Sequence, residues 1–383
     1  MRAALDDHSA DVPEPKTARM VRPMRQDDLP VVAGLFGRVF RPSGVKDAAA
    51  LEAYLAELLF GSPAYSEAYG SLVHDDPSTG ITAAVLSVPM TFNVEGERVT
   101  ARLLCSFMSE GRGGLSGAAR ISGALRAKRQ DFLLSDSASS LSAKHWTAVG
   151  GQVLTTQSLD WRRVLRPASA TREIWGQRLP RLRLLLALLP CGAIDALARR
   201  LKPALVPELQ SECTVEKTSA AEFLNSARPL LARFPVHPLW PEEEFSWLTD
   251  LAARNHALGT LHFGRMRDPD GVFAAMAWYS DGRKATVLHL LTDEGRELDA
   301  VTSMLAAFDA EGLVMAEGMA QPFLMRALLS QRWITFFHAA SFALAAAFRL
   351  SMTLHAGGSL CGRLCLGKLE PPVDGSLIRS RTP

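Results

Sequence analysis

A glycine-rich stretch between an apolar strand and a helix constrains this chain more than any other feature of its sequence. The run VTARLLCSFMS (99–109) reads as a strand, and residues 111–117 that follow Glu110 hold four glycines in seven positions. Glycine lets the backbone approach a ligand closely. A helix N-terminus offers unpaired N–H groups and partial positive charge, and Arg112 suits bidentate contact with phosphate. The stretch therefore predicts an anion site, with a merely flexible loop as the alternative.

Two common nucleotide-binding motifs do not fit this stretch. A P-loop needs Gly-Lys-Ser/Thr, and no lysine occurs between Thr100 and Lys128. A dinucleotide fingerprint needs G-x-G-x-x-G inside a βαβ unit. Here the spacing after Gly113 is one residue too long, and turn signals join the preceding strands as hairpins. The sequence therefore argues against P-loop and Rossmann chemistry.

The two sides of the chain follow a similar order of predicted elements. In the first half this order is strand, helix, helix, three antiparallel strands, glycine stretch, helix, strand, helix and strand. The second half repeats it from residue 208 to residue 339. At the place of the glycine stretch it has Asp293-Glu294-Gly295-Arg296-Glu297, whose three carboxylates would repel an anion. We expect a duplicated architecture with one anion site.

The element order and the segment SEGRGGLSGAAR resemble the GNAT superfamily of acyl-CoA acyltransferases, from Val21 to about Arg166. The loop-less second half is similar to bacterial double-GNAT proteins. The resemblance implies tandem GNAT-like α/β (α+β) domains, each with a mixed, mainly antiparallel sheet flanked by helices. The expected division is a disordered tail (1–19), an acyl-CoA-binding domain (20–166), a basic helical linker (167–206) and a degenerate GNAT-like domain (207–383).

This resemblance also implies a ligand and the residues that hold it. The co-substrate would be acetyl-CoA or another acyl-CoA, and the acceptor an amine or hydroxyl of a small molecule or saccharide. The pantetheine arm would lie beside the end of the strand, and the following stretch would hold the pyrophosphate. The residues at these positions are Ser106, Phe107, Met108, Gly111, Arg112, Gly113, Gly114, Leu115, Ser116 and Gly117.

Acid–base groups are harder to place, because the family commonly uses a tyrosine as the acid. The tyrosines of the first half all precede the predicted core strands. Glu110 and Asp136, at the ends of two strands expected to be neighbours, are therefore the predicted catalytic groups, with His145 behind them. Each also has a structural interpretation, as a solvated or helix-capping side chain. A non-catalytic scaffold or acyl-CoA sensor with this fold is the alternative function.

Charge and cysteine content limit the partners and the compartment. With 42 Lys+Arg against 40 Asp+Glu the net charge is +2, which argues against a nucleic-acid partner. Five cysteines are too few for a secreted disulfide scaffold and form no recognisable zinc pattern, so we expect a cytoplasmic protein without a metal site.

Two further segments have alternative interpretations. The basic, leucine-rich segment 172–203 is expected to pack as a helix on a neighbouring domain, with contact to an anionic membrane surface as the minority alternative. In the second half, aromatic and polar residues are expected in the core or in an acceptor pocket. These residues are Trp240, Glu243, Trp278, Tyr279 and His289.

Overall fold

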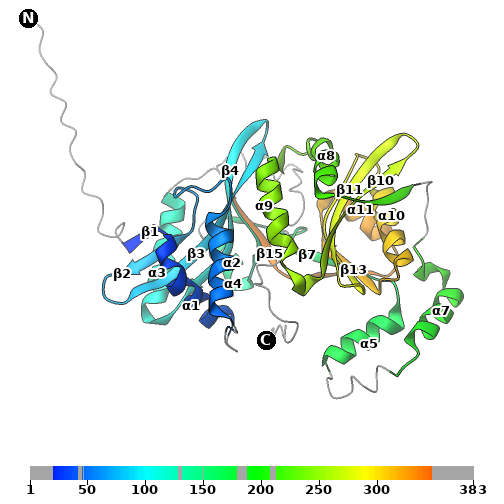
Figure 1. Cartoon of the computed structure of the whole chain (residues 1–383), viewed down its shortest axis with the longest axis horizontal. Coiled ribbons are helices and arrows are strands. Elements are labelled where there is room, and N and C mark those ends of the chain that lie inside the picture. The colour runs from blue at the N-terminus through cyan, green and yellow to red at the C-terminus, as the bar shows by residue number, and fades with distance from the viewer. Residues whose placement is uncertain are drawn as a thin grey trace, which may run out of the picture.

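The computed structural model describes residues 20–41, 45, 47–127, 132–148, 150–178, 188–207 and 213–346. These residues form two mixed, mainly antiparallel sheets flanked by helices (Figure 1). The predicted fold class is therefore confirmed. The disordered tail predicted for 1–19 lies outside the described residues.

The first sheet has the strand order β1-β2-β3-β4-β5-β15-β6, and β9 pairs with β3. Helices α1 and α2 pack on one face, while α3 and α4 pack on the other. The strands are β1 (Val21–Pro23), β2 (Leu72–Asp76), β3 (Gly80–Val94), β4 (Glu97–Ser109), β5 (Phe132–Ala138), β6 (Gln152–Leu154), β9 (Val236–Pro238) and β15 (Ser341–Ala346). The helices are α1 (Leu29–Phe40), α2 (Ala48–Phe60), α3 (Gly111–Ala127) and α4 (Ser140–Ala148).

The second sheet has the order β14-β7-β13-β12-β11-β10-β8, in which only β12 and β13 run parallel. Helices α8 and α9 pack on the face toward the first sheet, and α10 and α11 on the other. The strands are β7 (Leu159–Val164), β8 (Thr214–Thr218), β10 (Thr260–Asp268), β11 (Gly271–Ser280), β12 (Lys284–Thr292), β13 (Met315–Met319) and β14 (Ile334–His338). The helices are α8 (Ala220–Leu231), α9 (Glu242–Ala253), α10 (Glu297–Ala310) and α11 (Met325–Ser330), besides α5 (Pro167–Arg178) and α7 (Cys191–Leu201) between the two halves of the chain.

The two sheets exchange strands. β7 lies in the second sheet between β13 and β14, and β15 lies in the first sheet between β5 and β6. The last strand predicted for the first half is therefore wrong as a single strand: residues 152–165 contain β6 and β7, which lie in different sheets. The chain turns between them at 155–158, where the Ser158 hydroxyl donates to the Leu154 carbonyl and accepts from the Phe342 amide. The domain boundary near residue 166 stays a prediction, and β7 lies just before it in the sheet of the other half.

One buried cluster joins the two halves. It contains side chains of α1 and α2 together with Phe223, Trp240 and Phe245 of the second half. Within it, the buried Glu244 carboxylate accepts hydrogen bonds from the Thr91 amide and from its hydroxyl at 2.7 Å. Burial raises the pKa of Glu244. The halves therefore share a core and are not two independently packed units.

Candidate functional site

The end of β4 parts from its parallel neighbour β5. The two strands are paired at Arg102–Leu133 and Leu103–Leu134, and their register continues no further among the described residues. Just beyond this point β4 carries a bulge at Cys105, where its register with β3 shifts. The side chains of residues 104–107 are half-buried. The first sheet therefore opens along one strand edge, where an extended ligand could add its own hydrogen bonds.

The buried Arg102 side chain anchors β4 just before this opening. Its guanidinium donates to the Tyr69 carbonyl at 3.0 Å and also to the Ala68 carbonyl. Burial lowers the pKa of Arg102 to about 10. These bonds tie the chain before β2 to the last paired residues of β4.

The glycine stretch forms the first turn of α3 and is not a turn in front of it. The helix begins at Gly111, whose φ is 70°, whereas the sequence predicted a helix from residue 118. Glycine allows the sharp change of direction at this φ. A Cβ on Gly114 would lie 3.2 Å from the Ser109 carbonyl carbon, so the first turn sits close against the end of β4. The first N–H groups of α3, which have no partner inside a helix, therefore lie at the end of the open strand edge.

Not every predicted residue of this stretch faces the opening. A Cβ on Gly117 would lie 2.9 Å from His74 Nδ1 and 3.1 Å from the Ala83 Cβ, so Gly117 packs α3 against β2 and β3. Leu115 and Ser116 are exposed. Arg112 and Gly113 lie in the same first turn, and the position of the Arg112 side chain is outside the described part of the structure. The part these residues play in binding stays a prediction.

The three predicted residues of β4 point in different directions. Met108 is buried in the shared core, whereas Phe107 packs on the cluster beneath α3. Ser106 is half-buried directly after the bulge. Alternation places Ser106 and Met108 on the face of β4 away from α3, and of these two only Ser106 is partly exposed.

The predicted acid–base groups lie on the two strands that diverge. Glu110 joins β4 to α3, and its carboxylate accepts a hydrogen bond from Arg38 of α1 at 2.7 Å. Asp136 is half-buried on β5. His145 lies on α4, and its side chain is outside the described residues. The Arg38 contact was not predicted; it brings a guanidinium close to the first turn of α3.

A groove of about 380 Å³ lies where the exchanged strands cross. Its lining includes Thr155, Thr156, Ser158 and His338. His338 Nε2 lies 3.3 Å from the Ser341 hydroxyl, and Ser341 pairs with Ala138 at the end of β5. Sequence reasoning missed this groove because no local pattern brings residues 155–159 together with residue 338.

The second half repeats the parting of strands but fills the gap. β12 and β13 pair up to Val287–Gly318, and β12 has a bulge at Leu288. Residues 288–292 are all buried there, and the remaining cavity is about 10 Å³, room for one water at most. Trp240, Trp278, Tyr279 and His289 are likewise buried, so for these four the core interpretation is confirmed and the acceptor-pocket alternative is wrong.

Metal and membrane features can be assessed for the same residues. Among the described residues, no group of three or more His, Cys, Asp or Glu side chains is placed to hold a metal ion. Over the same residues, no helix combines the length and the apolar character needed to cross a bilayer.

Comparison with known proteins relates these features to a fold. No protein-family model matches the chain, and no curated protein matches its sequence significantly. A probable N-acyltransferase from Enterococcus faecalis V583, a conserved protein of unknown function, superposes with a TM-score of 0.54 at 10% identity, covering 84% of this chain and 71% of that one. A GCN5-related N-acetyltransferase from Anabaena variabilis ATCC 29413 gives 0.55 at 9% identity, covering 85% and 72%.

The fold and the opening define an α/β protein whose central strand parts from its parallel neighbour in front of a helix N-terminus. More particularly, the chain has the fold of the GCN5-related N-acetyltransferases, as its sequence predicted.

Proposed function

We propose that the chain transfers an acyl group from acyl-CoA to an amine or hydroxyl acceptor, with the donor bound in the first half. The observation that carries this proposal is the open edge of β4 beyond Leu103, which leads directly into the glycine-rich first turn of α3. A pantetheine arm is extended and carries amides that can pair with a strand edge. Its pyrophosphate would meet the helix N-terminus, with Arg38 as a nearby cation.

The reaction would take place near the bulge at Cys105. The acceptor nitrogen or oxygen attacks the thioester carbonyl, the carbon–sulfur bond breaks, and CoA leaves as the thiol after taking up a proton. A backbone N–H of the open strand edge would stabilise the oxyanion of the tetrahedral intermediate. We assign the base to Asp136 or Glu110, and the acceptor, a small molecule or saccharide, to the groove beside His338.

The proposal assigns one donor site to each chain. In the first half, residues 104–107 at the parting strands are half-buried and glycines follow them. In the second half, residues 288–292 are buried, and Asp293, Glu294 and Glu297 precede or begin α10. Both differences disfavour a second pyrophosphate-binding site in the second half of the chain.

An acceptor-dependent assay of thiol release tests the proposed activity. Purified protein is incubated with acetyl-CoA or a longer acyl-CoA and a panel of amines, alcohols and saccharides, and free CoA is titrated with a thiol reagent. We expect release that needs the acceptor and falls at least about a hundredfold in Asp136→Asn or Glu110→Gln, whichever is the base. The substitution Glu242→Gln, at an exposed carboxylate on α9, serves as the control and should leave thiol release unchanged.

A non-catalytic acyl-CoA sensor is the second candidate, and one contact favours it. The Glu110 carboxylate is engaged with Arg38 at 2.7 Å, which leaves it less available as a base. This function predicts saturable acyl-CoA binding without thiol release for every acceptor. Turnover lost in Asp136→Asn with binding retained would exclude it.

A further inference from the structure

Helix α7 carries an apolar stripe on its solvent side. Ile194, Leu197 and Leu201 are 48%, 59% and 72% exposed. Their spacing of three and four residues places them on one face of the helix. Another side of the helix carries the buried Cys191 and Asp195. The helix is amphipathic in the reverse of the usual sense, because a carboxylate is buried while leucines are exposed to solvent.

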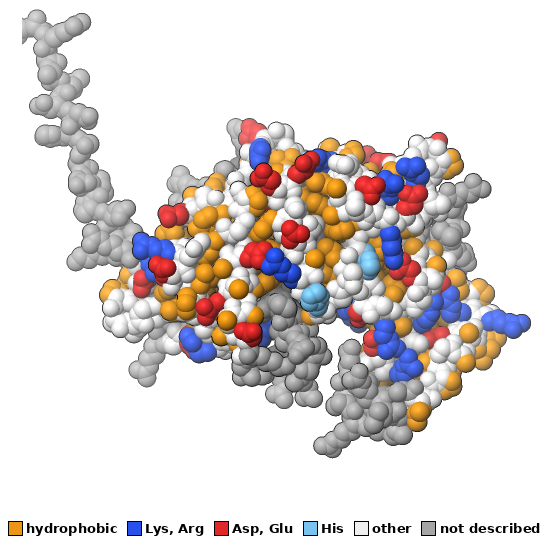
Figure 2. Space-filling view, in the orientation of Figure 1, with side chains coloured by type: hydrophobic (Ala, Val, Ile, Leu, Met, Phe, Trp, Pro, Cys, Tyr) orange, Lys and Arg blue, Asp and Glu red, His pale blue; other side chains and the backbone are white. Residues whose placement is uncertain are grey.

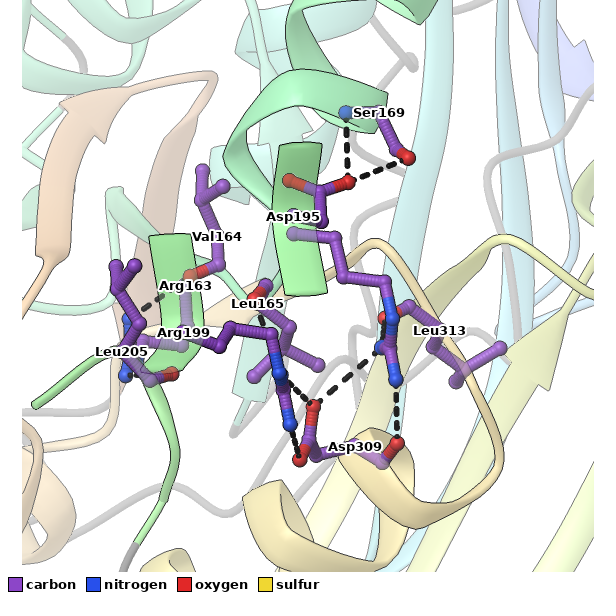
Figure 3. A network of polar contacts seen from close by, with 10 residues as sticks. Arg163, Val164, Leu165, Ser169, Asp195, Arg199, Leu205, Asp309 and Leu313 are labelled. Carbon is purple, nitrogen blue, oxygen red and sulfur yellow. Dashed lines mark hydrogen bonds and ion pairs between the residues drawn. The ribbon is translucent and has the colours of Figure 1, made fainter. Parts of the chain in front are cut away.

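A polar network fixes this orientation (Figure 3). The Asp195 carboxylate accepts from the Ala168 and Ser169 amides at 2.7 and 3.0 Å and from the Ser169 hydroxyl at 2.6 Å, and so caps α5. Arg199 donates to both carboxylate oxygens of Asp309 on α10, at 2.5 and 2.6 Å. Turning the apolar stripe inward would break these bonds, leaving the Ala168 and Ser169 amides without their acceptor and the Asp309 carboxylate without Arg199. The polar network therefore holds α7 with its apolar stripe exposed to solvent.

The charges around the stripe are of one sign. Arg200 and Lys202 are exposed. The acids of the described residues 167–178 and 188–207 are Glu173 and Asp195. Asp195 is buried in the network, and the Glu173 side chain is mostly covered and lies 4.0 Å from Arg283. The exposed surface of this described part is therefore apolar and basic, without an exposed acid.

An exposed tryptophan extends the same surface. Lys202 Nζ lies 5.9 Å from the centre of the Trp333 ring, which is 52% exposed at the start of β14. We call Ile194, Leu197, Arg200, Leu201, Lys202 and Trp333 the α7 surface. It lies beside the second sheet, on the side of the molecule where α5 and α7 project, and hydrophobic and basic side chains gather there (Figure 2).

We infer that the α7 surface docks the protein on an anionic lipid bilayer. The leucine stripe and Trp333 would enter the boundary between headgroups and acyl chains, while Arg200 and Lys202 meet lipid phosphates. A second copy of the chain fits less well, because a twofold contact would bring this basic surface against the same basic surface of the other copy. The inference is independent of the proposed acyl transfer.

Vesicle sedimentation of the full chain tests the inference. We expect binding to vesicles that contain phosphatidylglycerol, little binding to phosphatidylcholine alone, and weakening by salt. The double variant Leu197→Glu/Leu201→Glu should bind at least about tenfold more weakly, whereas Val31→Glu, at an exposed valine on α1, should bind like the wild type. Circular dichroism and gel filtration check that the variants are folded.

Three kinds of result would overturn the inference. One is a failure to prefer anionic lipid, seen either as equal binding to neutral and anionic vesicles or as no binding to both. Another is unchanged binding of the double variant. The third is a dimer of the wild-type chain, measured by sedimentation equilibrium, that the same double variant dissociates, because the α7 surface would then be covered by a second copy.

Discussion

His289 is a buried imidazole whose titration should be visible in the stability of the whole protein. Its side chain is 1% exposed, and neither ring nitrogen has a hydrogen-bond partner among the described residues. The ring packs edge-on against Trp240, with centroids 5.0 Å apart. Desolvation lowers the pKa of His289 from 6.5 to about 4. The native state therefore resists protonation over a pH range in which the unfolded chain accepts a proton.

The sign and size of the effect follow from this difference. As pH falls below 6.5, the unfolded state binds a proton that the native state does not bind until about pH 4. Stability is thus lost across this window, by about 3 kcal/mol at 1.36 kcal/mol for each pH unit. In His289→Phe the aromatic contact is retained and the titration is removed. The free energy of unfolding of this variant relative to wild type should rise by about 3 kcal/mol between pH 7 and pH 4.

Urea denaturation at several pH values measures this difference, and the other titrating groups cancel because both proteins share them. Parallel curves for His289→Phe and wild type would refute the reasoning. They would mean that the imidazole is hydrated or paired in the native protein.

Four further substitutions probe packing and polar contacts. Gly117→Ala should destabilise the protein by about 1–3 kcal/mol through overpacking against His74, whereas Gly123→Ala, with open space around it, should stabilise it by up to about 1 kcal/mol in thermal melts. Asp195→Ala should cost about 1–3 kcal/mol and release the N-terminus of α5 to amide hydrogen exchange. Because the pKa of Glu244 is raised in the native state, the wild-type protein loses stability as pH rises. In urea melts the free energy of unfolding of Glu244→Gln relative to wild type should therefore be larger at pH 8 than at pH 5.

Local sequence patterns predicted the elements that precede the site. The alternating run 99–109 and the glycines after it define β4 and the start of α3, because strand periodicity and glycine content act over short distances. The helix begins earlier than predicted: glycines are poor helix formers, so the pattern placed the start of the helix after them.

The strand exchange and the contacts between distant residues could not be predicted in this way. β15 pairs with β5 and β6, and this pairing depends on long-range register that the sequence SFALAA does not encode locally. The same is true of the Arg38–Glu110 pair and of His338 at the groove. Glu110 and Asp136 were proposed from their expected positions at strand ends and stay a prediction, whereas contacts such as Arg38–Glu110 depend on tertiary packing.

Calorimetric titration with acetyl-CoA and longer acyl-CoAs tests the central proposal most directly, because it measures both the affinity and the number of donor sites. We predict one acyl-CoA site per chain. The affinity should fall at least about tenfold in Gly114→Val, because the new side chain would push the first turn of α3 away from Ser109. The affinity should be retained in Gly123→Val on the same helix. Two sites per chain, no saturable heat with any acyl-CoA, or wild-type affinity in a folded Gly114→Val variant would contradict the account.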